Sequence, residues 1–256
     1  MKVLFLDAPY TGKVELCKKT IDFIKKNHVK NVALYASVQF VNKINTVKKQ
    51  LKELKVKITT SKAARTHVES QLLGCVSYHE SLNLSNLSKI DYFLYIGDGK
   101  FHPYALMYAQ KESKDFKQII CNDPMTESMN LITQEDLKSI INRYTASLKK
   151  FLASDTIGTI TTVKPGQEQL FTALELEKKY KNKEFYHFID NDVSFDQLEN
   201  FPFIDIWINT ACPRIGTDDQ EKFIKGIKNT IYQVIQNNDG ISTPKKKDKS
   251  ILISLD

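Results

Sequence analysis

Cysteine is scarce in this chain, and the patterns missing around it exclude several kinds of site. The 256 residues contain four cysteines and no CxxC or HxxxH pair, so neither a zinc finger nor a disulfide framework is expected. No apolar run approaches the ~20 residues that span a bilayer, and the start of the chain has no signal-peptide cleavage site. We therefore expect a cytoplasmic protein that makes no membrane contact.

The chain also lacks a concentrated basic surface pattern, although it is basic overall. The net charge is +7, and the lysines are spread over every predicted helix, as is typical of solvated helix faces. The one dense run, at residues 245–249, is part of a predicted basic tail over residues 241–256. A nucleic-acid partner is therefore not favoured.

Strand and helix patterns alternate along the whole sequence, which predicts an α/β fold: two similar units, each a mostly parallel sheet covered by helices. Residues 1–154 form the predicted first unit and residues 155–240 the second. A long helix over residues 133–154, with Thr133 as its N-cap, is the predicted connector. We also expect strands at residues 3–6, 91–96 and 204–208, a helix over residues 14–26 and a closing helix over residues 220–236.

Cys212 follows the apolar run at residues 203–208, which has the length and composition of a buried strand. Open α/β sheets bind ligands at the carboxyl ends of such strands. Cys75 lies among loop residues beside another strand, so the two cysteines occupy what look like matching places. This arrangement predicts a shared centre, most simply a metal cluster. Cys17 and Cys121 fall within helix and strand patterns, where core packing is favoured.

Two further loops are candidates for ligand binding. Gly97, Asp98 and Gly99 follow the strand at residues 91–96 and precede a helix that starts near His102, so their amides could face an anion or form a tight turn. Lys164, Gly166 and Gln167 follow the first strand of the second unit and could hold a carboxylate or phosphate, or simply turn the chain. Near Cys212, Arg214 could stabilise a thiolate or bind a carboxylate, and Asp218 could do the same work or cap the next helix.

Together these segments resemble the diphthamide synthesis proteins, the 2-(3-amino-3-carboxypropyl)histidine synthases. The similarity extends over about residues 1–236, in family order. It is carried by Gln71-Leu72-Leu73-Gly74-Cys75, Tyr95-Ile96-Gly97-Asp98-Gly99-Lys100-Phe101-His102, Lys164-Pro165-Gly166-Gln167, and Asn209-Thr210-Ala211-Cys212-Pro213-Arg214 with Asp218. The Ser37-Val38-Gln39 turn also looks like the family's pattern.

The resemblance implies a radical enzyme. In the family, one cysteine from each of three α/β domains holds a [4Fe–4S] cluster, and S-adenosylmethionine, the substrate, yields a 3-amino-3-carboxypropyl radical. The radical modifies a histidine of translation elongation factor 2, the first step of diphthamide biosynthesis. Cys75 then matches the middle-domain metal ligand and Cys212 the last-domain ligand. The cofactor-binding residues implied are Gly97, Asp98, Gly99, Phe101, His102, Lys164, Gly166, Gln167, Arg214 and Asp218.

The sequence departs from the family in having no match to its first domain. We therefore expect a subunit of this transferase that works with a chain supplying that domain, or with a homo- or heterodimer mate. Cys17 or Cys121 as a substitute ligand remains an alternative. So do a non-catalytic partner subunit and a nucleotide-binding α/β module without a cluster.

Overall fold

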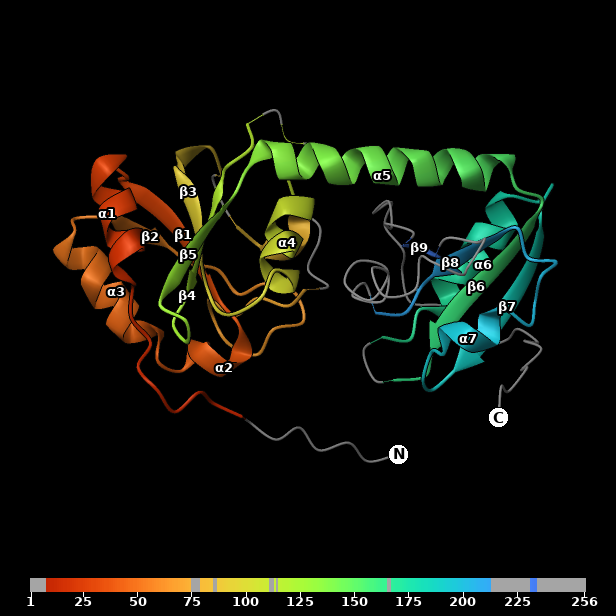
Figure 1. Ribbon diagram of the computed structural model, residues 1–256, viewed down its shortest axis with the longest axis horizontal. Coiled ribbons are helices and arrows are strands. Elements are labelled where there is room, and N and C mark those ends of the chain that lie inside the picture. Colours follow the sequence, from red (N-terminus) through yellow and green to blue (C-terminus); the bar gives the residue numbers. More distant parts are fainter. Residues whose placement is uncertain are drawn as a thin grey trace. The chain divides into compact units, whose positions relative to one another are not determined.

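The computed structural model describes residues 8–74, 79–84, 87–110, 113, 115–164, 167–212 and 231–233. The chain forms two compact units, Met1–Ile141 (unit 1) and Asn142–Asp256 (unit 2). The division falls inside the long helix α5 (Gln134–Ala153), shown in Figure 1. The sequence placed the boundary at the end of this helix instead.

Unit 1 is built on a five-stranded sheet in the order β2-β1-β3-β4-β5. β1 and β3 are buried along almost their whole length, which explains their continuous apolar sequences. Four strands are parallel and the last is antiparallel: β1 (Asn31–Ala36), β2 (Lys57–Thr59), β3 (Tyr92–Ile96), β4 (Ile119–Asp123) and β5 (Ser128–Ile132). β5 was not predicted, because its half-exposed mix of polar and apolar residues carries little strand signal.

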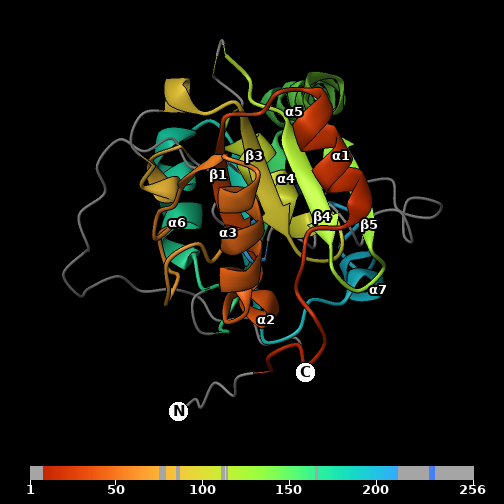
Figure 2. The same ribbon diagram turned by 90° about the vertical axis from the view of Figure 1, so that its left-hand side faces the viewer.

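Helices cover both faces of this sheet. α1 (Lys18–Lys26) and α3 (Ile44–Glu53) pack on one face, where Ile24, Val47 and Leu51 join the apolar side chains of β1 and β3, as Figure 2 shows. α4 (Phe101–Tyr108) packs on the opposite face. The remaining helices are short: α2 (Val38–Val41), η1 (Glu80–Leu82) and η2 (Leu87–Lys89).

The first helix begins later than residue 14, and a buried asparagine explains where. Asn122 Oδ1 accepts hydrogen bonds from Cys17 N and Thr20 Oγ1, both at 2.8 Å. Asn122 Nδ2 donates to Glu15 O at 3.0 Å. These bonds hold the chain before α1 in a non-helical form. The long helix is confirmed, and at its start Thr133 N and Oγ1 donate to Asp136 Oδ2 at 2.7 and 3.0 Å.

Unit 2 is built on a four-stranded parallel sheet in the order β7-β6-β8-β9. Its strands are β6 (Thr156–Thr162), β7 (Glu184–Asp190), β8 (Ile206–Asn209) and β9 (Ile231–Gln233), with helices α6 (Leu170–Lys179) and α7 (Phe195–Leu198). Residues 231–233 pair with β8, so the closing helix predicted over residues 220–236 is wrong there. The rest of that helix, the strand at residues 3–6 and the tail at 241–256 lie outside the described residues. The predicted α/β class, with two mostly parallel sheets, is confirmed.

The two units repeat one topology: β2-β1-β3-β4 corresponds to β7-β6-β8-β9. A carboxylate clamp fixes the residue-level alignment. Asp91 Oδ2 accepts the amides of Lys30 and Asn31 at 2.7 and 2.8 Å, and Asp205 Oδ2 accepts those of Asp155 and Thr156 at 3.1 and 2.9 Å. Asn31 therefore corresponds to Thr156.

Candidate functional site

In unit 1 the predicted glycine loop lies at the carboxyl edge of the parallel strands, between β3 and α4. Gly99 has a φ of 64°, a left-handed conformation that favours glycine. Gly97 is needed for another reason: a Cβ there would lie 2.5 Å from the Tyr95 hydroxyl. Asp98 accepts a 2.8 Å hydrogen bond from Gln39 Nε2, which joins this loop to the short helix α2. The start of the loop is thus packed against Tyr95, whereas Gly99 has open space around it.

The segment that leads into Cys75 reaches the same edge. Residues 70–72 run beside the end of β1, because Ala36 N donates to Ser70 O at 2.7 Å and Leu72 N donates to Ala36 O at 2.9 Å. Gly74 then packs so closely on the Phe101 ring that a Cβ would overlap it. Cys75 itself lies outside the described residues. Its immediate predecessor contacts the first residue of α4.

Phe101 and His102 are part of the packing at this edge. The His102 ring stacks on Tyr95, with centroids 6.4 Å apart and planes 12° apart. It also meets Phe101 edge-on at 5.3 Å. These contacts connect the start of α4 to β3.

In unit 2, Cys212 lies just past the carboxyl end of β8 and is half-buried. The side chain of Asn209, itself buried, brackets the turn: Oδ1 accepts from Ala211 N and Nδ2 donates to Cys212 O, both at 2.9 Å. Thr161 and Thr210 share a 2.8 Å hydroxyl hydrogen bond just before this turn. The backbone at Cys212 is therefore held against the β6–β8 pair.

The second predicted loop of unit 2 lies at the same edge, after β6. Lys164 Nζ pairs with Asp192, so its charge is already partnered, and Gln167 N donates to Lys164 O at 3.0 Å to close a turn. Both members of this ion pair are substantially exposed, which makes it weak and exchangeable. Gly166, Arg214 and Asp218 lie outside the described residues.

Cys17 and Cys121 are core residues, as the sequence favoured. The Cys17 thiol lies 3.2 Å from Thr20 Oγ1 and is buried. Burial raises the pKa of the Cys121 thiol to about 12, although Lys100 acts in the opposite direction. A neutral, buried thiol such as that of Cys121 is a poor metal ligand. Cys17 is buried and already contacts Thr20, so neither residue is favoured as a substitute ligand. Within the described part of the chain, no three His, Cys, Asp or Glu side chains cluster as a metal site would require.

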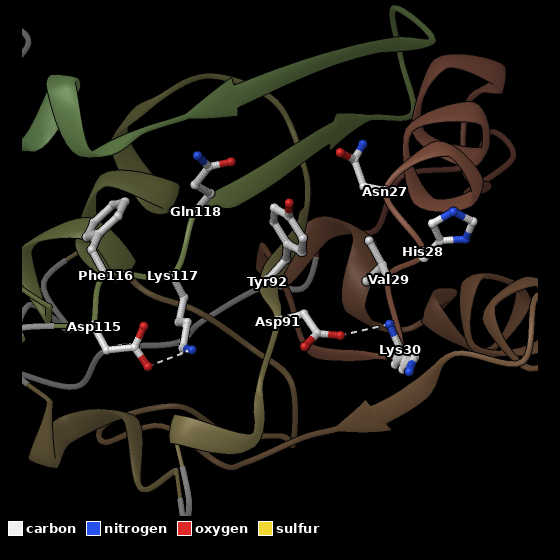
Figure 3. Close-up of a pocket in the computed structure, with 10 residues that line it drawn as sticks. All are labelled: Asn27, His28, Val29, Lys30, Asp91, Tyr92, Asp115, Phe116, Lys117 and Gln118. Atoms are coloured by element: carbon white, nitrogen blue, oxygen red, sulfur yellow. Dashed lines mark hydrogen bonds and ion pairs between the residues drawn. The ribbon is translucent and has the colours of Figure 1, made fainter.

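A pocket at the opposite, amino edge of the unit 1 sheet is polar but already paired. It has a volume of about 580 Å³ and is lined by residues of three strand starts, among them Tyr92 and Phe116. Figure 3 shows Asp115 bound to Lys117, at 2.7 Å, and Asp91 facing the backbone of Lys30. Because its carboxylates are satisfied, this pocket is not the candidate site.

The repeat gives Cys212 a counterpart in unit 1. From the clamp alignment, Cys212 corresponds to Asp98, after the third strand of the shared order. Gln71, four residues before Cys75 in the sequence, bridges to Ala36 as an outer-strand residue. The close contact of Gly74 with Phe101 was not predicted from the sequence, where the glycine before Cys75 was the single sign of it.

Among the described residues, no helix has both the length and the apolar character that a membrane span requires.

Several known proteins are similar to this chain. The sequence model of a family described as diphthamide synthesis protein matches residues 1–231. A 2-(3-amino-3-carboxypropyl)histidine synthase from Pyrococcus horikoshii is 29% identical over 211 residues, covering 80% of this chain and 56% of the relative. A protein from Schizosaccharomyces pombe named subunit 1 of that synthase is 28% identical over 237 residues, covering 85% of this chain and 49% of the relative.

A solved structure is similar in fold as well. The crystal structure of Dph2 from Pyrococcus horikoshii with a 4Fe-4S cluster aligns with a TM-score of 0.68 at 25% identity. The alignment covers 84% of this chain and 58% of that one. The chain thus spans about half the length of the curated relatives it matches.

Proposed function

The chain belongs to the diphthamide synthesis protein family, and we propose that it is a cluster-binding subunit of a 2-(3-amino-3-carboxypropyl)histidine synthase. Cys75 and Cys212 would be two thiolate ligands of a [4Fe–4S] cluster, and the substrate would be S-adenosylmethionine. The acceptor would be a histidine of translation elongation factor 2, in the cytoplasm. A further ligand would come from another polypeptide segment, on a partner chain.

What supports this proposal is that the residues leading to Cys75, up to Gly74, and the turn at Cys212 each lie at the carboxyl edge of parallel strands, where α/β folds bind ligands. Gly74 anchors one segment on Phe101, and Asn209 brackets the other. The donor chemistry fits as well, because thiolates are the ligands that iron–sulfur clusters use. The two buried cysteines have separate packing roles, which leaves Cys75 and Cys212 for the metal.

The residues of this chain would bind and orient rather than react. The glycine loop, held by the Gln39–Asp98 hydrogen bond, would let a ligand approach the backbone at Gly99 closely. Lys164 could exchange Asp192 for a substrate carboxylate, since their ion pair is exposed and such pairs contribute little stability. When bound, a reduced cluster supplies the electron that cleaves a carbon–sulfur bond of S-adenosylmethionine.

The proposal is tested by anaerobic purification of the chain together with a polypeptide equivalent to the part of the Pyrococcus horikoshii relative that it does not match. We expect iron, sulfide and an absorbance near ~420 nm typical of such clusters, and modification of elongation factor 2 when reductant and S-adenosylmethionine are added. Ala at Cys75 or Cys212 should remove both signals, whereas Ala at Cys17 should keep them.

Two results would count against the proposal in different ways. Colourless, iron-free protein under these conditions would exclude the cluster and favour a nucleotide-binding α/β module. Full modification by the Cys75→Ala and Cys212→Ala variants would instead favour a non-catalytic partner subunit.

A further inference from the structure

Four buried side-chain hydroxyls in the described part of the chain have no hydrogen-bond partner, and all four lie at the carboxyl ends of parallel strands. They belong to Ser37, Ser70, Tyr95 and Thr162. Leaving a buried donor unpaired is costly, and native proteins rarely do so without a reason. Their common location points to a ligand rather than to chance.

Three of these hydroxyls belong to unit 1, on residues next to the ends of β1 and β3. Ser37 N donates to Ile96 O at 3.2 Å, and Ser70 O accepts from Ala36 N at 2.7 Å, so both serines flank the end of β1. The Tyr95 hydroxyl ends beside the Gly97 Cα, within 2.5 Å of where a Cβ would be. All three residues are at most 3% exposed.

A neighbouring tyrosine shows what a satisfied hydroxyl looks like in the same sheet. Tyr35 pairs directly with Tyr95 across β1 and β3, and both side chains are fully buried. The Tyr35 hydroxyl lies 2.7 Å from Ser61 Oγ, whereas the Tyr95 hydroxyl has no partner. A phenylalanine would fill the position of Tyr95 equally well, so packing does not explain the hydroxyl.

The oxygen atoms around Tyr95 indicate the kind of group that the subsite would take. Hydroxyl oxygens accept hydrogen bonds as well as donate them. The Asp98 carboxylate follows on the glycine loop, where Gln39 Nε2 donates to its Oδ1 at 2.8 Å. These acceptors fit a ligand group that carries N–H donors and positive charge. Burial raises the pKa of the Tyr95 hydroxyl, so it remains protonated and neutral.

We propose that Ser37, Ser70 and Tyr95 form a subsite that binds the ammonium group of an amino-acid moiety, held between their hydroxyls and the Asp98 side. The inference rests on the proposed function, in which S-adenosylmethionine supplies that moiety. Thr162 corresponds to Ser37 in the clamp alignment, and its unpaired hydroxyl marks the equivalent edge of unit 2.

The test compares Tyr95→Phe with Tyr35→Phe in the cluster-loaded complex, using two probes. S-adenosylmethionine carries the amino-acid moiety, and 5′-deoxy-5′-methylthioadenosine lacks it. We expect Tyr95→Phe to weaken S-adenosylmethionine binding by about 10-fold or more, the loss of one hydrogen bond to a charged group. Binding of the second probe should not change. Ser37→Ala should act in the same direction.

Stability measurements separate this role from a structural one. Because the Tyr95 hydroxyl is unpaired, Tyr95→Phe should leave the melting temperature unchanged or raised, whereas Tyr35→Phe, which loses the Ser61 bond, should lower it. Equal S-adenosylmethionine affinity for wild type and Tyr95→Phe would overturn the inference alone, as would equal destabilisation by the two variants, which would indicate a trapped water. A wild-type complex that binds neither probe would overturn the proposed function and the subsite with it.

Discussion

The two units share a strand order and a carboxylate clamp but fill the space between their central strands differently. In unit 1 Ala33 pairs with Phe93, and at the corresponding positions of unit 2 Gly158 pairs with Trp207. Each unit combines a small residue with a ring, and the larger ring faces the smaller partner. Close packing makes such volumes interdependent. The comparison teaches that the repeat conserves backbone register and total volume, not residue identity.

The units differ more at the edge that carries the candidate site. β7 runs beside β6 without a break to Thr162 and Asp190. In unit 1 the corresponding outer strand is divided, with β2 pairing the start of β1 and Gln71 bridging to its last residue. The excursion between them lets the chain return to the edge at Gly74, next to Cys75. One break in an outer strand therefore distinguishes the two edges, because it brings the segment up to Gly74 to the edge of unit 1.

The largest effect is expected from exchanging the small residue of unit 2. A Cβ at Gly158 would lie 2.5 Å from the Trp207 ring, so Gly158→Ala should destabilise by about 3 kcal/mol, as overpacking does. Adding Trp207→Phe recreates the Ala33–Phe93 pair of unit 1 and should recover part of that loss. Urea unfolding of both single variants and the double variant measures the coupling. If the losses of unfolding free energy in the two single variants simply added up in the double variant, the proposed equivalence of the two residue pairs would be contradicted.

A smaller and equal effect is expected at the two clamps. Asp91→Ala and Asp205→Ala each leave two strand-start amides without their carboxylate. Each should cost about 2 kcal/mol, the range for hydrogen bonds to a charged group. Hydrogen exchange of the strand amides reads each unit separately, and in each variant only the unit that carries the change should lose protection. If Asp91→Ala and Asp205→Ala both reduced amide protection in the same unit, the two clamps would not be equivalent.

The smallest effect is a pH dependence confined to unit 1. The thiol of Cys121 has its pKa raised by burial from 9.0 to about 12, whereas the corresponding position in unit 2 is Gln233. Because the folded state holds this proton more tightly, the stabilisation is full below pH 9 and is lost as the pH rises toward 12. Between pH 9 and 10 the wild type should lose about 1 kcal/mol on this account.

The second buried cysteine, Cys17, provides the control for this pH dependence. Cys121→Ala should remove that loss, whereas Cys17→Ala should keep it, when the free energy of unfolding is measured by urea at each pH. An equal alkaline loss in the wild type and Cys121→Ala would show that the thiol does not titrate as its burial requires.

Much of the fold could be predicted from the sequence, because buried parallel strands such as β3 have continuous apolar sequences. The start of α5 could be predicted from Thr133 and the acidic residues that follow it. β5 could not, since an edge strand with one exposed face lacks that signal. The loop at residues 97–102 was recognised from its glycines. The unpaired hydroxyl of Tyr95 was not, because a partner such as Ser61 for Tyr35 comes from tertiary structure. The correspondence of Cys212 with Asp98 likewise depends on the register of the sheets.

The most direct test asks whether Cys75 and Cys212 hold one centre. Iron content and the electron paramagnetic resonance signal of the reduced protein are compared for Cys75→Ala, Cys212→Ala and the double variant, each purified anaerobically with the partner polypeptide. Ligands of one shared cluster act as a unit, so we predict the same residual level in all three proteins. Retention of a substantial signal in each single variant, with loss only in the double variant, would contradict a shared centre.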